Sequence, residues 1–482
     1  MFYGRETQIE RFNALWRKRV PSFVVCRGRR RIGKSTLVRE FASRSGATFL
    51  KLEGLAPDDH MTNVKQLAGF REQLGAVSDS SVPKLRNWTE AWMAVDEVLK
   101  GLDGRKVVLL DEVSWMGGYD NTFPAKLKVA WDNLFSHHTD LIVFVCGSVS
   151  TWIHENILKS KGFVGRISLD TIVTELPLME CVKFWGAKAR RLDVREILDV
   201  LSVTGGVPRY LEEVDPSLSA DENIRRMCFT PEGYLFREFN ELFNDIVSRT
   251  APTKRRILEA LVEGPMSGTD LSERLAIPRN GRMSDLLDEL ETAGFIVKAQ
   301  GLNPATGRRA RVDQYRLRDN YTRFFLRYVA GHIPEIESGV YTFSGVSLLP
   351  AWEAMMGLQF ENLILNNISS VIPALGLGGR AILSAAPYRC MRSERGGGVQ
   401  VDLLIQTATL AMIVEIKRKK SLGPEVEDDL RQKVARLPVR KGMSVRTALV
   451  YAGQLSAALA ASELIDACVP VEALLQTRGA VS

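Results

Sequence analysis

The feature that most constrains this chain is a glycine-rich loop at residues 28–36. The apolar run at residues 22–26 predicts a buried strand, and helical spacing begins at Leu37. Between them stands Gly28-Arg29-Arg30-Arg31-Ile32-Gly33-Lys34-Ser35-Thr36, which has the pattern G-x-x-x-x-G-K-S. Glycines let backbone N–H groups surround phosphate oxygens, and the helix N-terminus adds partial positive charge. The loop therefore predicts an ATP site, with Lys34 on the β- and γ-phosphates and Ser35 on Mg²⁺.

Two further strands are predicted to end in polar residues suited to a bound nucleotide. The apolar run at residues 106–110 leads into Asp111 and Glu112. We expect Asp111 to contact Mg²⁺, directly or through water, and Glu112 to act as the general base. A run at residues 141–146 leads, after one glycine, into Ser148, the candidate for sensing the γ-phosphate. A simple turn residue at a strand end is the alternative for Ser148.

An arginine near the end of this predicted core is a further candidate for the nucleotide site. Arg166 stands between Gly165 and Ile167. Its guanidinium could stabilise charge in the transition state or bind phosphate, acting in its own chain or in a neighbouring copy. An ordinary surface arginine is the alternative.

Length and composition restrict the class of protein. At roughly 150 residues per domain, 482 residues predict about three domains. Hydrophobic residues make up 45% and charged residues 25%, without repeats, which excludes a disordered or coiled-coil chain. Apolar runs of about six residues are too short to span a bilayer. The N-terminus lacks a signal-peptide pattern, and six scattered cysteines exclude a disulfide scaffold or zinc ribbon. A cytoplasmic protein without a membrane partner is expected.

Several motifs together resemble the archaeal-type ATPases of the STAND/AAA+ superfamily. They occur in the order Phe2-Tyr3-Gly4-Arg5-Glu6, the arginine-rich phosphate loop, Leu110-Asp111-Glu112, Cys146-Gly147-Ser148 and Gly205-Gly206-Val207-Pro208-Arg209-Tyr210-Leu211. The resemblance implies that Tyr3, Gly4 and Arg5 lie by the adenine. It also implies that Pro208 and Arg209 belong to a helical lid that approaches the nucleotide. A nucleotide-dependent homo-oligomer is compatible with it.

The middle of the chain has the order of a winged helix. Helical segments at residues 255–261, 267–275 and 283–290 are followed by a strand at 295–298, a loop rich in Gly, Pro and Arg, and a strand around 315–317. The net charge of +7 is concentrated here, since residues 246–330 hold 15 basic and 10 acidic residues.

Two functions fit this winged helix. For nucleic-acid binding, Arg279 and Arg282 would enter the major groove, and arginines of the wing would contact phosphates. The wing candidates are Arg308, Arg309 and Arg311. A rigid adaptor between the ATPase and an effector is the alternative, because acidic side chains on the expected recognition helix would repel phosphate.

The last part of the chain carries a second set of acidic residues. Glu361 lies near the start of an apolar helical segment, Asp402 lies in an alternating strand, and a second strand carries Glu415 and Lys417. Residues two apart on a strand point to one face, and Asp402 can lie on the neighbouring hairpin strand. Two carboxylates there suit Mg²⁺ or Mn²⁺, and a lysine beside them can position water or neutralise phosphate charge. A structural ion pair is the alternative.

This pattern resembles the PD-(D/E)xK nuclease fold, in the divergent version called DUF234 that follows archaeal-type ATPases. Glu361, Asp402, Glu415 and Lys417 match its motif, as does Gln400 two residues before Asp402. No proline precedes Asp402, which makes the spacing less specific.

The sequence thus predicts an α/β multidomain protein in four parts. These are a P-loop ATPase core of the ASCE type at residues 1–175, a helical lid at 176–245, a winged helix-turn-helix at 246–330 and a restriction-endonuclease-like domain at 331–482. The leading hypothesis is an ATPase that controls a metal-dependent nuclease, with DNA favoured over RNA. The alternative is a STAND-type signalling switch whose last domain only binds nucleic acid or a protein partner.

Overall fold

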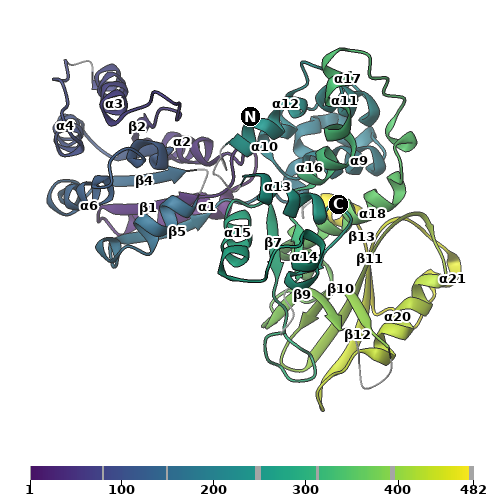
Figure 1. The fold of residues 1–482 in the computed structure, drawn as a ribbon. Coiled ribbons are helices and arrows are strands. Elements are labelled where there is room, and N and C mark those ends of the chain that lie inside the picture. Colours follow the sequence, from purple (N-terminus) through teal and green to yellow (C-terminus); the bar gives the residue numbers. More distant parts are fainter. Residues whose placement is uncertain are drawn as a thin grey trace. The chain divides into compact units, whose positions relative to one another are not determined.

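The computed structural model of the chain (Figure 1) describes residues 2–78, 81–147, 150–244, 251–310, 314–390 and 397–476. The chain divides into two compact units, residues 1–174 and 175–482. None of the helices within the described ranges is long and apolar enough to cross a membrane.

The first unit is built on a parallel sheet with the strand order β2-β3-β4-β1-β5. Its strands are β1 (Ser22–Arg27), β2 (Thr48–Glu53), β3 (Lys106–Asp111), β4 (Leu141–Gly147) and β5 (Ile167–Ile172). Strands β1, β3 and β4 are almost wholly buried, which explains their continuous apolar sequence. Because β4 pairs with both β1 and β3, the carboxyl ends of the three strands with predicted site residues meet at one sheet edge.

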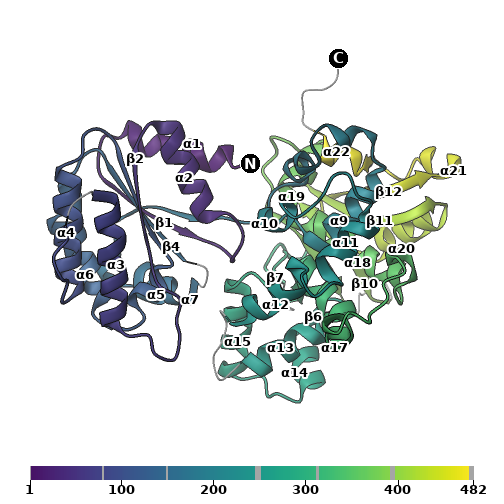
Figure 2. The ribbon, with the colours of Figure 1, turned by 90° about the horizontal axis from the view of Figure 1, so that it is seen from above.

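Helices cover both faces of this sheet. They are α1 (Glu6–Arg17), α2 (Lys34–Ser45), α3 (Asn63–Ser78), α4 (Trp88–Lys100), α5 (Val113–Gly117), α6 (Phe123–Asn133) and α7 (Ser150–Ile153). Helices α1 and α2 pack on one face, where Phe12 and Phe41 meet Phe144 of β4 (Figure 2). Helices α3, α4 and α6 pack on the other through an aromatic cluster that includes Trp88 and Trp92. The sheet is therefore fixed from both sides.

The second unit begins with short helices and a winged helix. The short helices are α8 (Leu178–Cys181), α9 (Val194–Thr204), α10 (Pro208–Leu211), α11 (Ala220–Cys228) and α12 (Tyr234–Asn244). The winged helix comprises α13 (Ala251–Ala260), β6 (Met266–Ser267), α14 (Gly268–Leu275), α15 (Gly281–Thr292), β7 (Ile296–Ala299) and β8 (Gln314–Leu317). Ser267 and Asp270 form a capping box that starts α14, and Asn280 caps α15 by accepting from the N–H of Met283.

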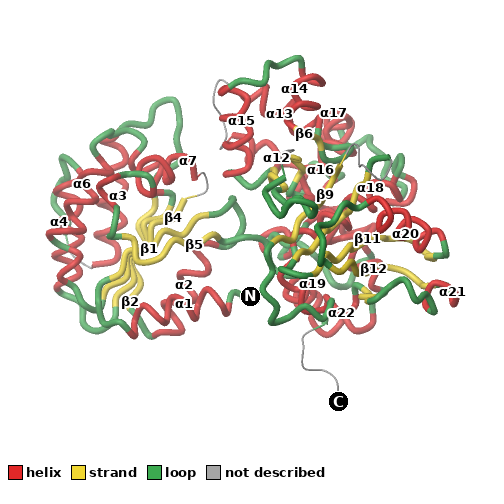
Figure 3. The backbone as a smooth tube through the Cα atoms, turned by 90° about the horizontal axis from the view of Figure 1, so that it is seen from below, coloured by secondary structure: helices red, strands yellow, loops and turns green. Residues whose placement is uncertain are grey.

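The last part of the second unit is a mixed sheet with the order β13-β12-β11-β10-β9 (Figure 3). Its strands are β9 (Ser384–Cys390), β10 (Val399–Gln406), β11 (Leu410–Leu422), β12 (Ser444–Leu455) and β13 (Ala467–Pro470). The associated helices are α16 (Asn320–Phe324), α17 (Ile333–Glu337), α18 (Trp352–Asn366), α19 (Ile368–Ala374), α20 (Glu425–Arg436), α21 (Ala457–Ala460) and α22 (Glu472–Leu475). Strands β9, β10 and β11 are antiparallel neighbours, whereas β11, β12 and β13 run parallel, with α20 making the crossover from β11 to β12.

Candidate active sites

The backbone of the glycine-rich loop adopts the left-handed conformations that a phosphate cradle needs. Gly28 has φ +153°, and a Cβ at that position would lie 2.2 Å from the carbonyl oxygen of Val173. Arg31 and Gly33 have φ 66° and 85°. Only glycine fits at position 28, because a side chain there would collide with backbone.

Lys34 and Ser35 lie at the start of α2, beside the end of β3. The ammonium of Lys34 donates to the carbonyl oxygens of Gly28 and Arg29 at 2.9 and 3.1 Å. The hydroxyl of Ser35 donates to Oδ2 of Asp111 at 2.6 Å. The structure therefore brings the two predicted Mg²⁺ ligands, Ser35 and Asp111, into direct contact, while Lys34 rests on neutral loop carbonyls.

Sequence reasoning missed a third residue at this acid. Nζ of Lys51, on β2, lies 3.1 Å from Oδ2 of Asp111 and 2.6 Å from Oε2 of Glu53. Burial acts to lower the pKa of Lys51, but its hydrogen bond to Glu53 and the charge of Asp111 outweigh that effect and raise it. The sequence feature that could have indicated this contact is a lysine within β2, the strand that pairs directly with β3.

Glu112 leaves β3 in an unusual conformation. Its φ is 47°, in the left-handed region, and it precedes the first turn of α5. A Cβ on Gly54 would lie 2.6 Å from the carbonyl oxygen of Glu112, so the chain after β2 packs directly against this residue. Backbone strain of this kind, held by close packing, is typical of functional positions.

The N-terminal box lies against the phosphate loop. The guanidinium of Arg5 is buried and donates to the carbonyl oxygen of Ile32 at 3.1 Å. Gly4 and Arg5 both have positive φ, 69° and 70°, and Tyr3 precedes them. The box thus forms the entry to α1 next to the loop. The candidate Ser148 lies outside the described residues.

Arg166 lies at the end of the sheet opposite the phosphate loop, where the parallel strands begin. It precedes β5, whose first residue, Ile167, pairs in parallel with Phe23 near the start of β1. At about 3.3 Å per residue, the length of β1 separates Arg166 from the phosphate loop by about 15–20 Å. Its guanidinium makes two hydrogen bonds to Asp132 at 2.6 and 3.0 Å. The expectation that Arg166 acts on the nucleotide of its own chain is therefore wrong, because the strand direction places it at the wrong end.

Pro208 and Arg209 belong to the second unit. Pro208 is the first residue of α10, and Arg209 pairs with Glu212 and Glu213 while its guanidinium stacks 4.4 Å from the ring of Tyr234. The preceding Gly-x-Pro loop is fixed by a hydrogen bond from the N–H of Leu176 to the Gly206 carbonyl oxygen.

The described arginines of the recognition helix and of the wing are all exposed. Arg279 and Arg282 are exposed at the start of α15, and Arg279 donates to Thr269 at 3.1 Å. Arg308 and Arg309 are exposed on the wing, whereas Arg311 lies outside the described residues.

The loop of the wing, beyond the end of β7 at Ala299, is attached to the last part of the chain. The Leu302 carbonyl oxygen accepts from the side chain of Gln406 at 2.7 Å, and its N–H donates to Ser384 at 3.1 Å. The N–H of Arg440 donates to the Pro304 carbonyl oxygen at 3.0 Å. These contacts fix the wing loop at the start of β9, at the end of β10 and on the segment between α20 and β12.

A cavity of about 320 Å³ lies on the C-terminal sheet, and it contains three of the four predicted residues. Asp402 of β10 accepts from the N–H of Ile416 at 2.9 Å, which holds it beside Glu415 of β11. Glu415 is 0% exposed, and burial together with the charge of Asp402 raises its pKa to about 7. Lys417 lies 2.5 Å from Oε1 of Glu415.

Helix α20 supplies residues to this cavity that the sequence did not predict. Nζ of Lys433 lies 2.5 Å from Oε2 of Glu415 and 3.1 Å from Oδ2 of Asp429. Gln432 and Arg436 also line the cavity, as does Gln400 of β10. The spacing of 429, 432, 433 and 436 puts all four residues on one face of the helix.

Glu361, the fourth predicted residue, lies on α18 close to the other carboxylates but does not line the cavity. Burial raises its pKa; Arg316 and Arg323 oppose this, while Glu415 adds to it. Helix α18 is itself fixed to β8 and α16, since the Arg316 guanidinium donates to Asn366 at 2.9 Å and that of Arg323 to Gln359 at 2.9 Å.

The donor set at the cavity fits a hard divalent ion. Within the described parts of the chain, no group of three or more His, Cys, Asp or Glu side chains could hold a metal ion. Mg²⁺, however, is commonly bound by one or two carboxylates, with water and substrate phosphate completing its shell. Asp402 and Glu415 meet that requirement, because their carboxylates lie side by side on paired strands.

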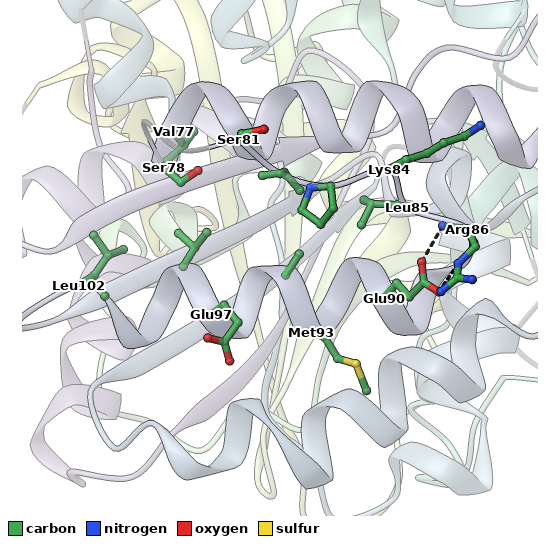
Figure 4. Close-up of a pocket in the computed structure, with 15 residues that line it drawn as sticks. Val77, Ser78, Ser81, Lys84, Leu85, Arg86, Glu90, Met93, Glu97 and Leu102 are labelled. Carbon is green, nitrogen blue, oxygen red and sulfur yellow. Dashed lines mark hydrogen bonds and ion pairs between the residues drawn. The ribbon is translucent and has the colours of Figure 1, made fainter.

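Another hollow lies on the first unit, away from every predicted residue. It measures about 810 Å³ and lies between the chain at residues 81–86 and helix α4. Figure 4 shows Arg86 and Glu90 paired at one end and Val77 and Leu102 at the other. Its lining contains no residue of the phosphate loop.

Comparisons with known proteins agree with the phosphate loop and its sheet. Residues 2–214 match a family model described as an ATPase domain predominantly from Archaea. A protein of Methanocaldococcus jannaschii, described as uncharacterized protein MJECL04, is 22% identical over 366 residues, which are 75% of this chain and 76% of that protein.

Two solved structures are also similar. The Walker-type ATPase PABY2304 of Pyrococcus abyssi has a TM-score of 0.49 and 19% identity over 68% of this chain and 96% of its own. The ORC2 protein of Aeropyrum pernix, in ADPNP–ADP complexes, has a TM-score of 0.45 and 14% identity over 70% and 95%. The family match supports an ATPase domain of the P-loop type within residues 2–214.

Proposed function

We propose that this protein is a P-loop ATPase that controls a metal-dependent nuclease site in its C-terminal sheet, with DNA as the favoured substrate. The observation that carries the nuclease part is the convergence of Asp402, Glu415 and Lys417 in one cavity. Buried charges are costly unless they are paired or bind an ion, so the fully buried Glu415, grouped with Asp402 and Lys417 in one hollow, favours a chemical role.

The ATPase chemistry is assigned to the edge of the first sheet. Lys34 would leave its loop carbonyls to contact the β- and γ-phosphates. Ser35 and Asp111 would hold Mg²⁺, which would stabilise charge on the transferred phosphoryl group. Glu112 takes the proton of the attacking water. Tyr3, Gly4 and Arg5 are proposed on the adenine side, together with Pro208 and Arg209 of the lid.

The nuclease chemistry is assigned to the cavity between β10, β11 and α20. Asp402 and Glu415 would hold Mg²⁺ or Mn²⁺, which polarises a phosphodiester and lowers the pKa of bound water. Lys417 neutralises charge on the phosphate oxygen. Glu361, with its raised pKa, is proposed to accept or hold a proton next to this pair.

The test is cleavage by the purified full-length protein. Supercoiled plasmid and single-stranded RNA are incubated with Mg²⁺ or Mn²⁺, with and without ATP, and compared with Lys417→Ala and Lys34→Ala. We expect cleavage that disappears in Lys417→Ala, and that responds to ATP in the wild type but not in Lys34→Ala. Absence of any cleavage that depends on Lys417 would contradict the nuclease assignment.

A specific observation favours the second candidate, a STAND-type switch whose last domain only binds. Each oxygen of Glu415 already faces an ammonium group, from Lys417 and Lys433. A cavity in this state can be a structural ion cluster or a phosphate-binding site without hydrolysis. Nucleotide-dependent assembly and nucleic-acid binding without cleavage would support this candidate.

The winged helix is proposed mainly as an adaptor. The hydrogen bonds of Leu302 and Pro304 to Ser384, Gln406 and Arg440 occupy part of the loop of the wing. Arg279 and Arg282 are still accessible at the start of α15, and they are the residues of this domain proposed to contact nucleic acid.

A further inference from the structure

The cavity on the C-terminal sheet has no net formal charge of its own. Its lining holds three carboxylates and three cations: Asp402, Glu415, Asp429, Lys417, Lys433 and Arg436. A polyanion gains little by entering a neutral site lined by carboxylates. One divalent ion would make the cavity positive by two charges, so phosphate binding there requires the metal first.

Glu415 cannot bind that metal while both of its oxygens hold ammonium groups. Oε1 faces Lys417 and Oε2 faces Lys433, each at 2.5 Å. Lys417 stands on the same strand as Glu415, two residues away, so both side chains point to one face of the sheet. Lys433 comes from α20 and lies 3.1 Å from a second carboxylate, Asp429, whereas Lys417 lies 4.0 Å from the same carboxylate. Lys433 is therefore the ammonium with the closer alternative partner.

The surroundings of Lys433 suit a residue with two positions. Its side chain is 13% exposed, whereas Glu415 is fully buried and Asp429 is 43% exposed. A four-carbon side chain can therefore move from the buried acid toward the cavity mouth without moving the helix. Arg436, one turn further on, lies on the same face and lines the same cavity.

We propose that Lys433 is an exchangeable cation: its ammonium neutralises Glu415 until a divalent metal ion replaces it, and it then contacts a phosphate of the nucleic-acid backbone. This rests on the proposed assignment of the cavity as a metal and nucleic-acid site. Lys433 thus opposes the binding of the metal and supports the binding of the polymer. A residue with only a structural role would affect both in the same direction.

The first measurement is metal binding. The nucleotide-free full-length protein is titrated with Mn²⁺, and the signal lost in Asp402→Asn is assigned to this cavity. We expect Lys433→Gln, which keeps a hydrogen-bond donor but no charge, to bind Mn²⁺ about tenfold more tightly than the wild type. The matched control is Arg431→Gln on the same helix, because Arg431 pairs with Glu427 and does not line the cavity.

The second measurement is nucleic-acid binding in the presence of Ca²⁺, which takes the same oxygen ligands. Anisotropy of a labelled duplex DNA and of a labelled single-stranded RNA is followed over a range of salt concentrations. We expect Lys433→Gln to lose about tenfold in affinity and about one unit of salt slope, as for one lost phosphate contact. Arg431→Gln is expected to leave affinity and slope unchanged.

The two measurements together decide the proposal. Opposite shifts support it, whereas a loss of both affinities, or no change in either, overturns it. Lys433→Met repeats the comparison if the glutamine variant melts at a lower temperature than the wild type. Neither measurement needs cleavage: opposite shifts without any cleavage would remove the nuclease assignment and keep this role, and cleavage with unchanged affinities would do the reverse.

Discussion

The lysines of the two sites contact different groups, which are neutral carbonyl oxygens at the phosphate loop and a carboxylate at the C-terminal cavity. At the phosphate loop, Lys34 rests on neutral backbone carbonyls, while Asp111 accepts from a serine hydroxyl. At the C-terminal cavity, Lys417 and Lys433 rest on a buried carboxylate. Both sets of contacts have an ammonium donor, but at the cavity the acceptor is charged as well, which adds the attraction between opposite charges. An incoming anion can therefore displace the first set of contacts more easily than the second. The comparison teaches that nucleotide phosphate can enter the first site directly, whereas a cation must enter the second site first.

The most disruptive test of this difference is Lys34→Ala. The ammonium is the group that leaves its carbonyls for the phosphates, so we expect ATP hydrolysis, measured as phosphate release, to fall at least about 100-fold. Mn²⁺ binding at the C-terminal cavity should stay unchanged, because it involves none of these atoms. The control is Arg39→Ala, an exposed residue of the same helix. Hydrolysis within threefold of the wild type in Lys34→Ala would refute the assignment of the first site.

A second test concerns the strand that carries Lys417. Its neighbour Arg418 is 2.6 Å from Asp199 of α9, and burial raises the pKa of Asp199 to about 6. Since the folded pKa lies above the unfolded value of 3.8, folding takes up a proton between these values. The contribution of Asp199 to stability is therefore full below about pH 4 and is lost as pH rises through about 6.

The substitution Asp199→Asn should weaken this pH dependence of stability. Two pH units of pKa difference correspond to about 3 kcal/mol at most. We expect the free energy of unfolding of Asp199→Asn, measured with urea between pH 4.5 and 7.5, to fall less with rising pH than that of the wild type. Glu353→Gln removes the other, exposed partner of Arg418, whose charge adds to the raised pKa of Asp199, and should flatten the slope less than Asp199→Asn does. Parallel pH curves for wild type and Asp199→Asn would show that Asp199 is ionised throughout.

Local sequence patterns predicted the strands that build both sites but not all of their contacts. The runs at residues 22–26, 106–110 and 141–146 each fall within one strand, and their polar ends meet because parallel strands share an edge. Lys51 and Lys433 were missed because their partners are distant in sequence. Lys433 stands in a helix rich in exposed charge, where no periodic signal separates a cavity residue from a solvated one.

Arg166 is the reverse case, a residue that the sequence analysis assigned to the nucleotide site of its own chain and that the structure places elsewhere. A glycine and an arginine close to the end of a predicted core suggested a phosphate contact, since sequence distance says nothing about which sheet edge is reached. The direction of β5 relative to β1 settles this for the residue's own chain. Strand direction is a property of the assembled sheet, which is why the phosphate loop, with all its groups in one short segment, was the easier site to predict.

The smallest expected effect tests whether a lysine competes with the metal ion at the first site as well. Lys51 lies 3.1 Å from Asp111, further than Lys433 from Glu415, and its side chain is 27% exposed. If it too neutralises a metal-binding acid, Lys51→Met should lower the Mg²⁺ concentration for half-maximal ATP hydrolysis, by about threefold because solvent screens the pair. Lys51→Arg keeps the charge and serves as the control. A higher Mg²⁺ requirement in Lys51→Met would mean that Lys51 positions Asp111 for the metal, and that cation exchange is restricted to the C-terminal cavity.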